Sequence, residues 1–320
     1  MLLTEKAARA KKLEPIQWKS NPEALEISYN RFPCTPAVED EAFETISLSF
    51  SSIETAQAAI ILCRLATLGQ TVSALGWQEA VTLGNRRSLY TTVVATLAAV
   101  HIVLSLGPPL VGFRRLSIVM EPLEGIIAGP YLGFLAALIG ATGGRLIRPE
   151  GLWIENFFGI AEAVGALGAG FLITRKWYLT VGIYGVQLLA FLMHPLAREI
   201  PLWTLWDTYL GFLAIFPAGY LVRKLGDAKS RAHRLIPVVG LTSFVAVELD
   251  VMVRIFMLIV GGLYQVYPIP VDALPWIFIA GAVQTPLEAA YSVACAVVVG
   301  VPALVALERS GVLSWPLTRS

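Results

Sequence analysis

The sequence has few charged residues, few cysteines and few histidines, and each shortage excludes a class of protein. Charged side chains make up 15% of the 320 residues and the net charge is +1, which gives no signal for nucleic-acid binding. The three cysteines, Cys34, Cys63 and Cys295, form neither a disulfide framework nor a metal pattern. The three histidines have no ligand spacing, so we expect no dedicated transition-metal site.

Several short enzyme motifs are also missing. The sequence has no Gly-Lys dipeptide and therefore no Walker A loop, which excludes ATP hydrolysis by that route. The apolar segments contain no HExxH motif, no GxSxG motif and no paired-aspartate motif. We therefore expect a protein that is not an enzyme and that needs no cofactor.

Apolar residues are abundant. The chain is 56% hydrophobic and its mean hydropathy is +0.68, and its long apolar runs are separated by short basic loops. This pattern is typical of a polytopic membrane protein. The candidate spans are Leu89–Leu106, Leu116–Gly129, Pro130–Leu146, Trp153–Ile173, Trp177–His194, Trp203–Leu221, Leu235–Leu263 and Leu274–Leu307.

The first 88 residues differ from the rest in carrying charges, turns and mixed patterning. Residues 24–32 and 43–50 have the pattern of strands, and the capping box at 51–54 predicts a helix over Ile53–Leu68. We therefore expect a small α+β domain at 1–88 and a transmembrane domain at 89–320. The start of the chain lacks the apolar core of a signal peptide, so we expect a cytoplasmic N-terminus.

The apolar stretch from Glu121 to Leu146 is broken near its middle by Gly129 and Pro130. Glycine is well suited to end one helix and proline to begin the next. We interpret the stretch as two short helices that meet at this break, with one kinked helix as the alternative. The two short helices would reach about 20–25 Å, less than the hydrocarbon core of about 30 Å, so they must be protected inside a bundle.

The basic residues in the loops distinguish between these interpretations. If the central stretch crosses twice, eleven arginines and lysines lie in the inside loops and five in the outside loops; if it crosses once, the two numbers exchange. The positive-inside rule therefore favours two crossings and about eight segments. A re-entrant hairpin in the central stretch would overturn this argument.

The stretch PLEGIIAGPYLGFLAALIG resembles the substrate-binding (S) component of energy-coupling factor (ECF) transporters. In that family a short second helix ends in a Gly-Pro break and a small-residue helix follows. The first span holds Ala95 and Ala99 at the AxxxA spacing that the family uses to dock its coupling subunit, and the last span resembles the closing helix of the family. The resemblance covers about Leu89 to Leu307, although the family core has six helices and lacks the N-terminal domain.

The resemblance implies a function and a set of partners. It implies binding of a vitamin or related micronutrient in the cell membrane, by a subunit that works with a coupling transmembrane subunit and ATPase subunits. A second hypothesis is a membrane sensor whose N-terminal domain signals to a cytoplasmic partner. A third, with the least support, is an intramembrane enzyme.

Ionisable residues inside the spans are costly and need a partner or a purpose. Asp250 and Arg254 are four residues apart on one helix, so we predict an ion pair between them. His101 is a lone histidine, for which a packing role and a ligand role both remain open, and Glu121 and Glu155 could also be interfacial residues that reach water. The candidate substrate-binding residues are Glu155, Asn156, Glu162, Glu248, Gln284 and Glu288. The alternative is that these groups only pair with Arg254 or reach lipid headgroups.

These candidates predict a cavity in the outer half of the bundle, between the fourth span and the last two. Because the spans carry more acidic than basic residues, we expect a ligand that is cationic or rich in hydrogen-bond donors. Its binding should weaken as the pH falls, since protonation removes the charge of the carboxylates. Neighbouring aromatic residues would suit a flat heterocycle.

Overall fold

The computed structural model describes the following residues: 86–107, 109–111, 114–147, 158–225, 232–267, 269–310 and 316. All of them belong to the unit Gln78–Ser320. The strands and the helix predicted in the first 68 residues therefore lie outside the described residues, and the predicted α+β domain stays a prediction.

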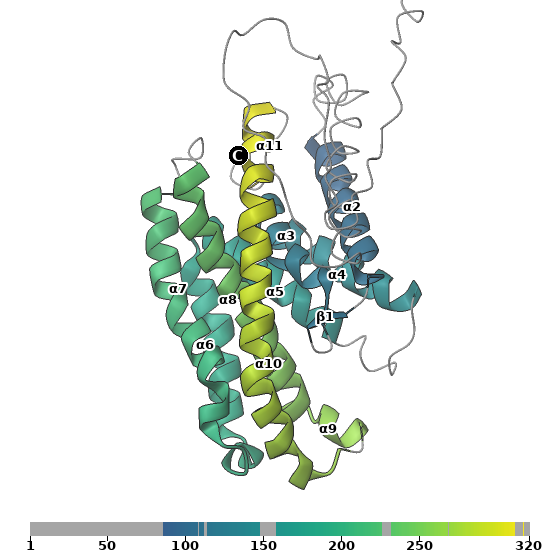
Figure 1. Cartoon of the computed structure of the whole chain (residues 1–320), viewed down its shortest axis with the longest axis vertical. Helices are drawn as coiled ribbons and strands as arrows, with labels where there is room; N and C mark the ends of the chain where they lie inside the picture. Colours follow the sequence, from purple (N-terminus) through teal and green to yellow (C-terminus); the bar gives the residue numbers. More distant parts are fainter. Residues whose placement is uncertain are drawn as a thin grey trace, which may run out of the picture. The chain divides into compact units, whose positions relative to one another are not determined.

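The described part of the chain is a helical bundle (Figure 1). Its α-helices are α2 (Arg86–Ser105), α3 (Met120–Ala128), α4 (Pro130–Ile147), α5 (Phe158–Ile173), α6 (Trp177–Met193), α7 (Trp206–Leu225), α8 (Ala232–Ile259), α9 (Leu263–Val266), α10 (Leu274–Cys295) and α11 (Val301–Ser310). A π-helical segment, Ala296–Gly300, joins α10 to α11, and short 3-10 helices precede α3, α7 and α10. Two short antiparallel strands, β1 (Pro109–Val111) and β2 (Arg114–Arg115), connect α2 to the 3-10 turn before α3.

The length and composition of these helices identify a multi-pass membrane protein. Within the described residues, five helical stretches are long and apolar enough to span a bilayer, and α5 and α6 are shorter apolar helices. Every predicted span overlaps one of these helices or α3. The short second segment is α3, whose nine residues cannot span the hydrocarbon core alone.

The break between α3 and α4 lies where the sequence predicted it. Gly129 ends α3 with a φ of 85°, a value that glycine tolerates, and Pro130 begins α4. The break packs against α5, because a Cβ on Gly170 would lie 2.4 Å from the Pro130 nitrogen. Gly125 of α3 is similarly close to the Ala166 carbonyl of α5. Small residues thus bring three helix backbones together and protect the short α3.

Helix α8 lies at the centre of the bundle and is largely buried. It contacts α3, α5, α6, α7, α10 and α11. Helix α2 has a different position, because its contacts with other helices are mainly with α4 and α3. It is therefore an edge helix (Figure 1).

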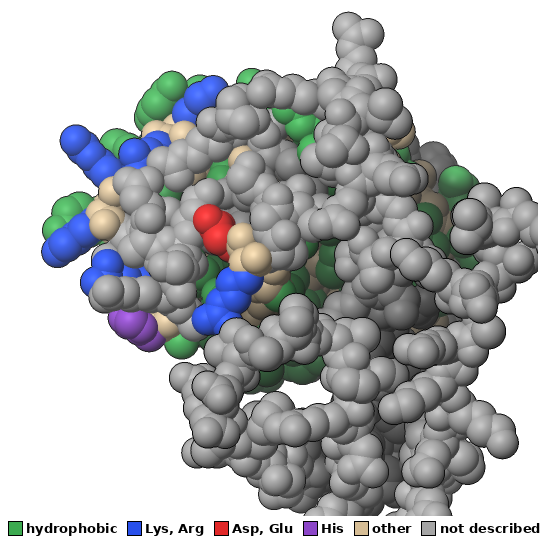
Figure 2. All heavy atoms as spheres, turned by 90° about the horizontal axis from the view of Figure 1, so that it is seen from above, with side chains coloured by type: hydrophobic (Ala, Val, Ile, Leu, Met, Phe, Trp, Pro, Cys, Tyr) green, Lys and Arg blue, Asp and Glu red, His purple; other side chains and the backbone are tan. Residues whose placement is uncertain are grey.

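The two ends of the bundle differ in charge. One apolar cluster joins Ile173 at the end of α5, Val222 near the end of α7, Leu235 near the start of α8 and Leu304 of α11, so these elements share one end. We call it the basic end, because five exposed basic residues surround it: Arg175, Lys176, Arg223, Lys224 and Arg309. Figure 2 looks toward this end and shows lysine and arginine side chains around the described surface.

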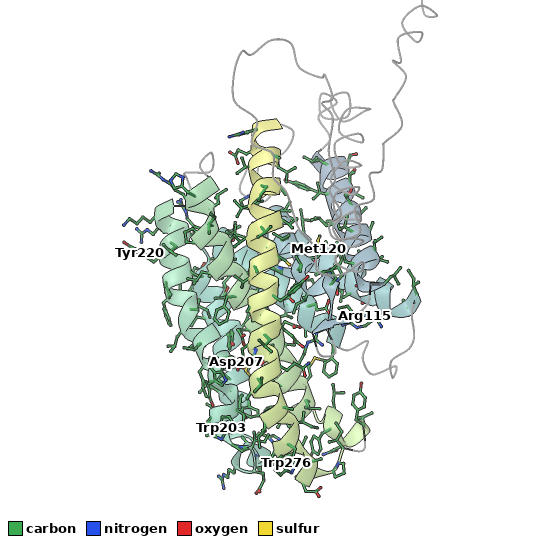
Figure 3. All side chains as sticks on the ribbon, in the orientation of Figure 1. Arg115, Met120, Trp203, Asp207, Tyr220 and Trp276 are labelled. Atoms are coloured by element: carbon green, nitrogen blue, oxygen red, sulfur yellow. The ribbon has the colours of Figure 1, made fainter. Side chains whose placement is uncertain are left out.

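The opposite end carries exposed residues of both signs, among them Arg198, Glu199 and Asp272. Trp203 and Trp276 are 62% and 72% exposed at this end (Figure 3). Such tryptophans are typical of the interface between a bilayer and water.

Candidate functional site

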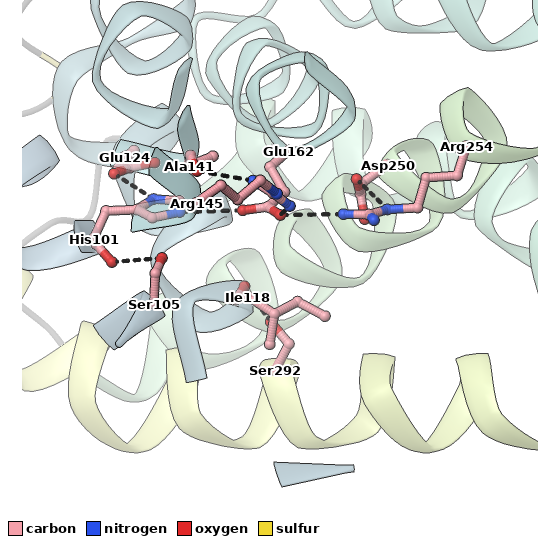
Figure 4. Close-up of polar contacts among 10 residues, drawn as sticks. All are labelled: His101, Ser105, Ile118, Glu124, Ala141, Arg145, Glu162, Asp250, Arg254 and Ser292. Atoms are coloured by element: carbon pink, nitrogen blue, oxygen red, sulfur yellow. Dashed lines mark hydrogen bonds and ion pairs between the residues drawn. The ribbon is translucent and has the colours of Figure 1, made fainter. Parts of the chain in front are cut away.

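A chain of polar contacts crosses the bundle from α2 to α8 (Figure 4). The His101 ring lies between two glutamates: its Nδ1 is 3.0 Å from Glu124 Oε1 and its Nε2 is 3.1 Å from Glu162 Oε2. His101 and Glu124 are fully buried and Glu162 is 5% exposed. The three side chains come from α2, α3 and α5, so a single histidine connects three helices.

The sequence of α2 explains why His101 points inward. Val94, Ala98, His101 and Ser105 follow helical spacing and are all buried, whereas the opposite face of the helix is exposed. On α4, Gly140 leaves room for the ring, since a Cβ there would lie 2.5 Å from the His101 Cβ. The glycine-rich sequence of α4 therefore allows a large polar side chain between two closely packed helices.

Two arginines converge on Glu162 from the other side. Arg145 of α4 and Arg254 of α8 both donate to Glu162 Oε1, the latter at 3.2 Å. Arg145 also donates to the Ala141 carbonyl at 3.0 Å, and Arg254 Nε donates to the two oxygens of Asp250 at 3.0 and 3.1 Å. The arginine side chains are 23% and 22% exposed, so the network is partly open to its surroundings at this point.

These contacts bear on the candidate ligand role of Glu162, for which pairing with Arg254 is the alternative. Two guanidinium groups, one of them that of Arg254, and an imidazole surround its carboxylate. The ligand role itself stays a prediction. A buried carboxylate needs such partners, because desolvation otherwise makes its charge very costly.

The polar chain lies toward the end of the bundle opposite the basic end. His101 is near the C-terminal end of α2, Glu162 near the N-terminal end of α5 and Arg254 near the C-terminal end of α8. Each is within about one and a half helical turns of that end of its helix.

A second polar cluster lies where α6, α7, α8 and α10 meet. Asp207 of α7 accepts hydrogen bonds from the hydroxyl of Thr285 on α10 and from the backbone of Thr208, the latter at 2.8 Å. The Tyr184 hydroxyl donates to the Thr208 carbonyl at 2.7 Å and is 3.2 Å from the Glu248 carbonyl. Asp207 and Glu248 are buried acidic residues next to a fully buried tyrosine.

On α10, Gln284 Nε2 donates to Glu288 Oε1 at 2.7 Å, and Glu288 is 3% exposed. Trp206 Nε1 donates to the Ala282 carbonyl at 3.0 Å and so fixes α7 against α10. Carboxylate, amide and hydroxyl groups thus lie beside aromatic rings in this part of the bundle.

The sequence allows Glu121 to be either an interior residue or an interfacial one that reaches water. In the structure it is fully buried, and its carboxylate lies against Gly165 of α5. A Cβ at Gly165 would meet that carboxylate and the Ala246 carbonyl of α8. Glu121 is therefore an interior residue that packs between α5 and α8.

The structure distributes the predicted substrate-binding residues over different groups. Glu162 belongs to the polar chain, Glu248 packs beside Tyr184, and Gln284 pairs with Glu288. Glu155 and Asn156 lie outside the described residues. The predicted ion pair of Asp250 and Arg254 is present, with Glu162 as a further partner of Arg254.

Sequence reasoning missed several participants. They are Arg145 of the polar chain, and Asp207 and Thr285 of the second polar cluster. A search for arginines near span ends could have found Arg145, because a cation one turn inside a span needs an anionic partner. Thr285 offers no such signal, since a hydroxyl on an apolar helix is common.

The predicted docking residues lie on the outer face of α2. Ala95, Ala99 and Val103 are exposed, while the opposite face holds His101. The same helix therefore presents small residues outward and contributes the central side chain of the polar chain inward.

Comparison of the chain with protein-family models, with curated proteins and with solved structures found no match.

Proposed function

We propose that this chain is the membrane-embedded substrate-binding subunit of an ECF-type uptake transporter for a vitamin or related small molecule. The observation that carries the proposal is the double role of α2. Its exposed Ala95 and Ala99 face allows another helix to approach closely, and its inner face joins the buried polar chain through His101. A subunit that passes information between a bound substrate and a partner needs such a connection.

The distribution of exposed charge supports an orientation. Basic residues at the cytoplasmic side are the usual arrangement in membrane proteins, and the basic end carries five exposed ones. We therefore place the basic end and the N-terminus in the cytoplasm of the cell and the polar chain in the outer half of the membrane.

We place the substrate beside α7 and α10, near Asp207, Gln284 and Glu288. Small-molecule sites are mostly apolar with a few fixed polar groups, and this region offers carboxylates, amides and hydroxyls beside Trp206. Such groups suit a flat ligand that carries hydrogen-bond donors. Glu162 is a poorer first contact, because two arginines already bind it.

The partner side of the proposal is tested by co-purification from native membranes. We expect the wild-type chain to retain a transmembrane coupling subunit and ATPase subunits, which supply the hydrolysis that a chain without a Walker A loop cannot perform. Ala95→Trp should abolish this assembly, because a large side chain forces helices apart. Ala280→Trp, at an exposed alanine of α10, is the matched control and should leave assembly intact.

Assembly that survives in Ala95→Trp would contradict docking through α2. Co-purification of a signalling protein without any ATPase would instead favour the membrane sensor. Mass spectrometry of small molecules retained through purification identifies the substrate, and loss of the retained molecule in Asp207→Asn tests its location.

A further inference from the structure

The two contacts of His101 determine how many protons His101, Glu124 and Glu162 hold together. Both ring nitrogens are within 3.1 Å of a carboxylate oxygen. A neutral imidazole has one N–H and one lone pair, so it can donate to only one of two ionised carboxylates. The other nitrogen would then direct a lone pair at a carboxylate oxygen, which is repulsive. Both hydrogen bonds form only when the group of three holds one more proton.

The surrounding charges indicate where that proton belongs. Arg145 and Arg254 both donate to Glu162, so Glu162 is stabilised as a carboxylate. Glu124 has no arginine partner among the described residues, and its Oε2 is buried without a hydrogen-bond partner there. The extra proton is therefore shared between His101 and Glu124, as an imidazolium with a carboxylate or as an imidazole with a carboxylic acid.

The other charged groups near the triad have different contacts. Asp250 is held by Arg254 on α8, and Glu121, also on α3, packs against Gly165 on α5. Arg115 of β2 donates to the Ser105 carbonyl at 2.9 Å, one turn beyond His101 on α2. None of these three contacts involves a ring nitrogen of His101.

We propose that Glu124, His101 and Glu162 form a buried site that binds one proton. This proton allows both hydrogen bonds of His101 to form, and these bonds join α2 to α3 and α5. The ligand of this site is the proton itself. When the proton is lost, one of the two bonds becomes a repulsion and the attachment of α2 weakens. The site depends on the contacts of His101, Glu124 and Glu162, and it exists whether or not the chain is a transport subunit.

The proposal predicts how stability depends on pH. Above about pH 6.5 an unfolded histidine is neutral and unfolded glutamates are ionised, so the unfolded triad holds no proton while the folded triad holds one. Stability must then fall as the pH rises, and the ratio of folded to unfolded protein should decrease about tenfold per pH unit. Below about pH 6.5 the unfolded histidine also gains a proton, and the dependence should vanish.

Reversible unfolding of the full chain in mixed detergent micelles from pH 7 to pH 9 measures this dependence. Glu124→Gln is the decisive variant, because an amide can donate to the neutral ring and both bonds then form without an extra proton. We expect the tenfold loss per unit in the wild type and its absence in Glu124→Gln. Glu121→Gln removes another buried carboxylate of the same helix and should keep the wild-type dependence.

An equal pH dependence in the wild type and Glu124→Gln would overturn the proposal, as would loss of the dependence in Glu121→Gln alone. If Glu124→Gln does not fold, spectra of the wild-type protein still test the proposal. Ring-nitrogen NMR shifts of His101, assigned against His194 and His233, should show a doubly protonated ring, or infrared spectra should show a buried carboxylic acid. A singly protonated ring without a carboxylic acid band would refute the site.

Discussion

The contact between His101 and Gly140 shows how one glycine determines the position of a buried polar side chain. A side-chain carbon at residue 140 would overlap the His101 Cβ, and both residues lie inside closely packed helices. Neither backbone can move without disturbing the contacts of α2 with α4. The glycine is therefore a requirement of the polar chain.

We predict that Gly140→Ala destabilises the protein by about 1–3 kcal/mol, because overpacking at a rigid contact costs this much. The measurement is the free energy of unfolding in mixed micelles. Gly182→Ala is the matched control, since residue 182 also lies inside a helix and a Cβ there meets nothing within 4 Å. The control should be neutral or stabilising by up to about 1 kcal/mol, because alanine favours a helix. Equal effects of the two substitutions would contradict the proposed role of Gly140.

At the scale of single residues, the sequence predicted the ion pair within one helix and missed the contacts of His101 between helices. Asp250 and Arg254 are four residues apart, so helical geometry alone brings them together. The partners of His101 are 23 and 61 residues away. Their meeting depends on how α3 and α5 pack against α2, which no spacing within one helix can reveal.

The polar chain depends on the short helix α3 and on the break at Gly129 that ends it. Because α3 is short and flanked by small residues, Glu121 and Glu124 reach the interior of the bundle. The sequence predicted the break because glycine and proline have strong backbone preferences. It did not predict the π-helical segment Ala296–Gly300, where Gly300 packs against Leu123 of α3.

We predict that Gly129→Ala destabilises the fold by about 1–3 kcal/mol. Gly129 has φ 85° and ψ −176°, a conformation that residues with a Cβ adopt only under strain. Unfolding in mixed micelles measures the loss. Gly281→Ala, within α10 and with nothing within 4 Å of its Cβ, is the control and should not be destabilising. A stable Gly129→Ala variant would show that the break tolerates other backbone angles.

At the scale of the whole molecule, hydropathy predicted the segments well and their assembly poorly. Each predicted span corresponds to a helix because burial in lipid requires an apolar run with internally satisfied backbone groups. Which spans become neighbours is decided by small residues such as Gly125 and Gly170, whose packing partners lie on another helix. The sequence therefore predicted an all-α bundle without predicting that Glu162 would meet two arginines.

The number of times the α3–α4 stretch crosses the membrane determines the sidedness of everything after it. Two crossings, like a re-entrant hairpin, place the start of α2 and the turn between α5 and α6 on the same side, whereas a single crossing places them on opposite sides. The exposed residues Ser88, Arg175 and Arg198 mark the start of α2, the α5–α6 turn and the α6–α7 connection.

We predict two crossings and not one, because a single crossing would put the exposed basic residues of the basic end outside the cell. In a variant from which Cys34, Cys63 and Cys295 have been removed, single cysteines at positions 88, 175 and 198 are probed in intact cells with a thiol reagent that cannot cross the membrane. Only the cysteine at 198 should react before permeabilisation, and all three should react afterwards. Reaction at 175 with protection at 198 would place the basic end outside the cell, as a single crossing of the α3–α4 stretch requires. That result would also move the polar chain of His101, Glu162 and Arg254 to the cytoplasmic half of the membrane.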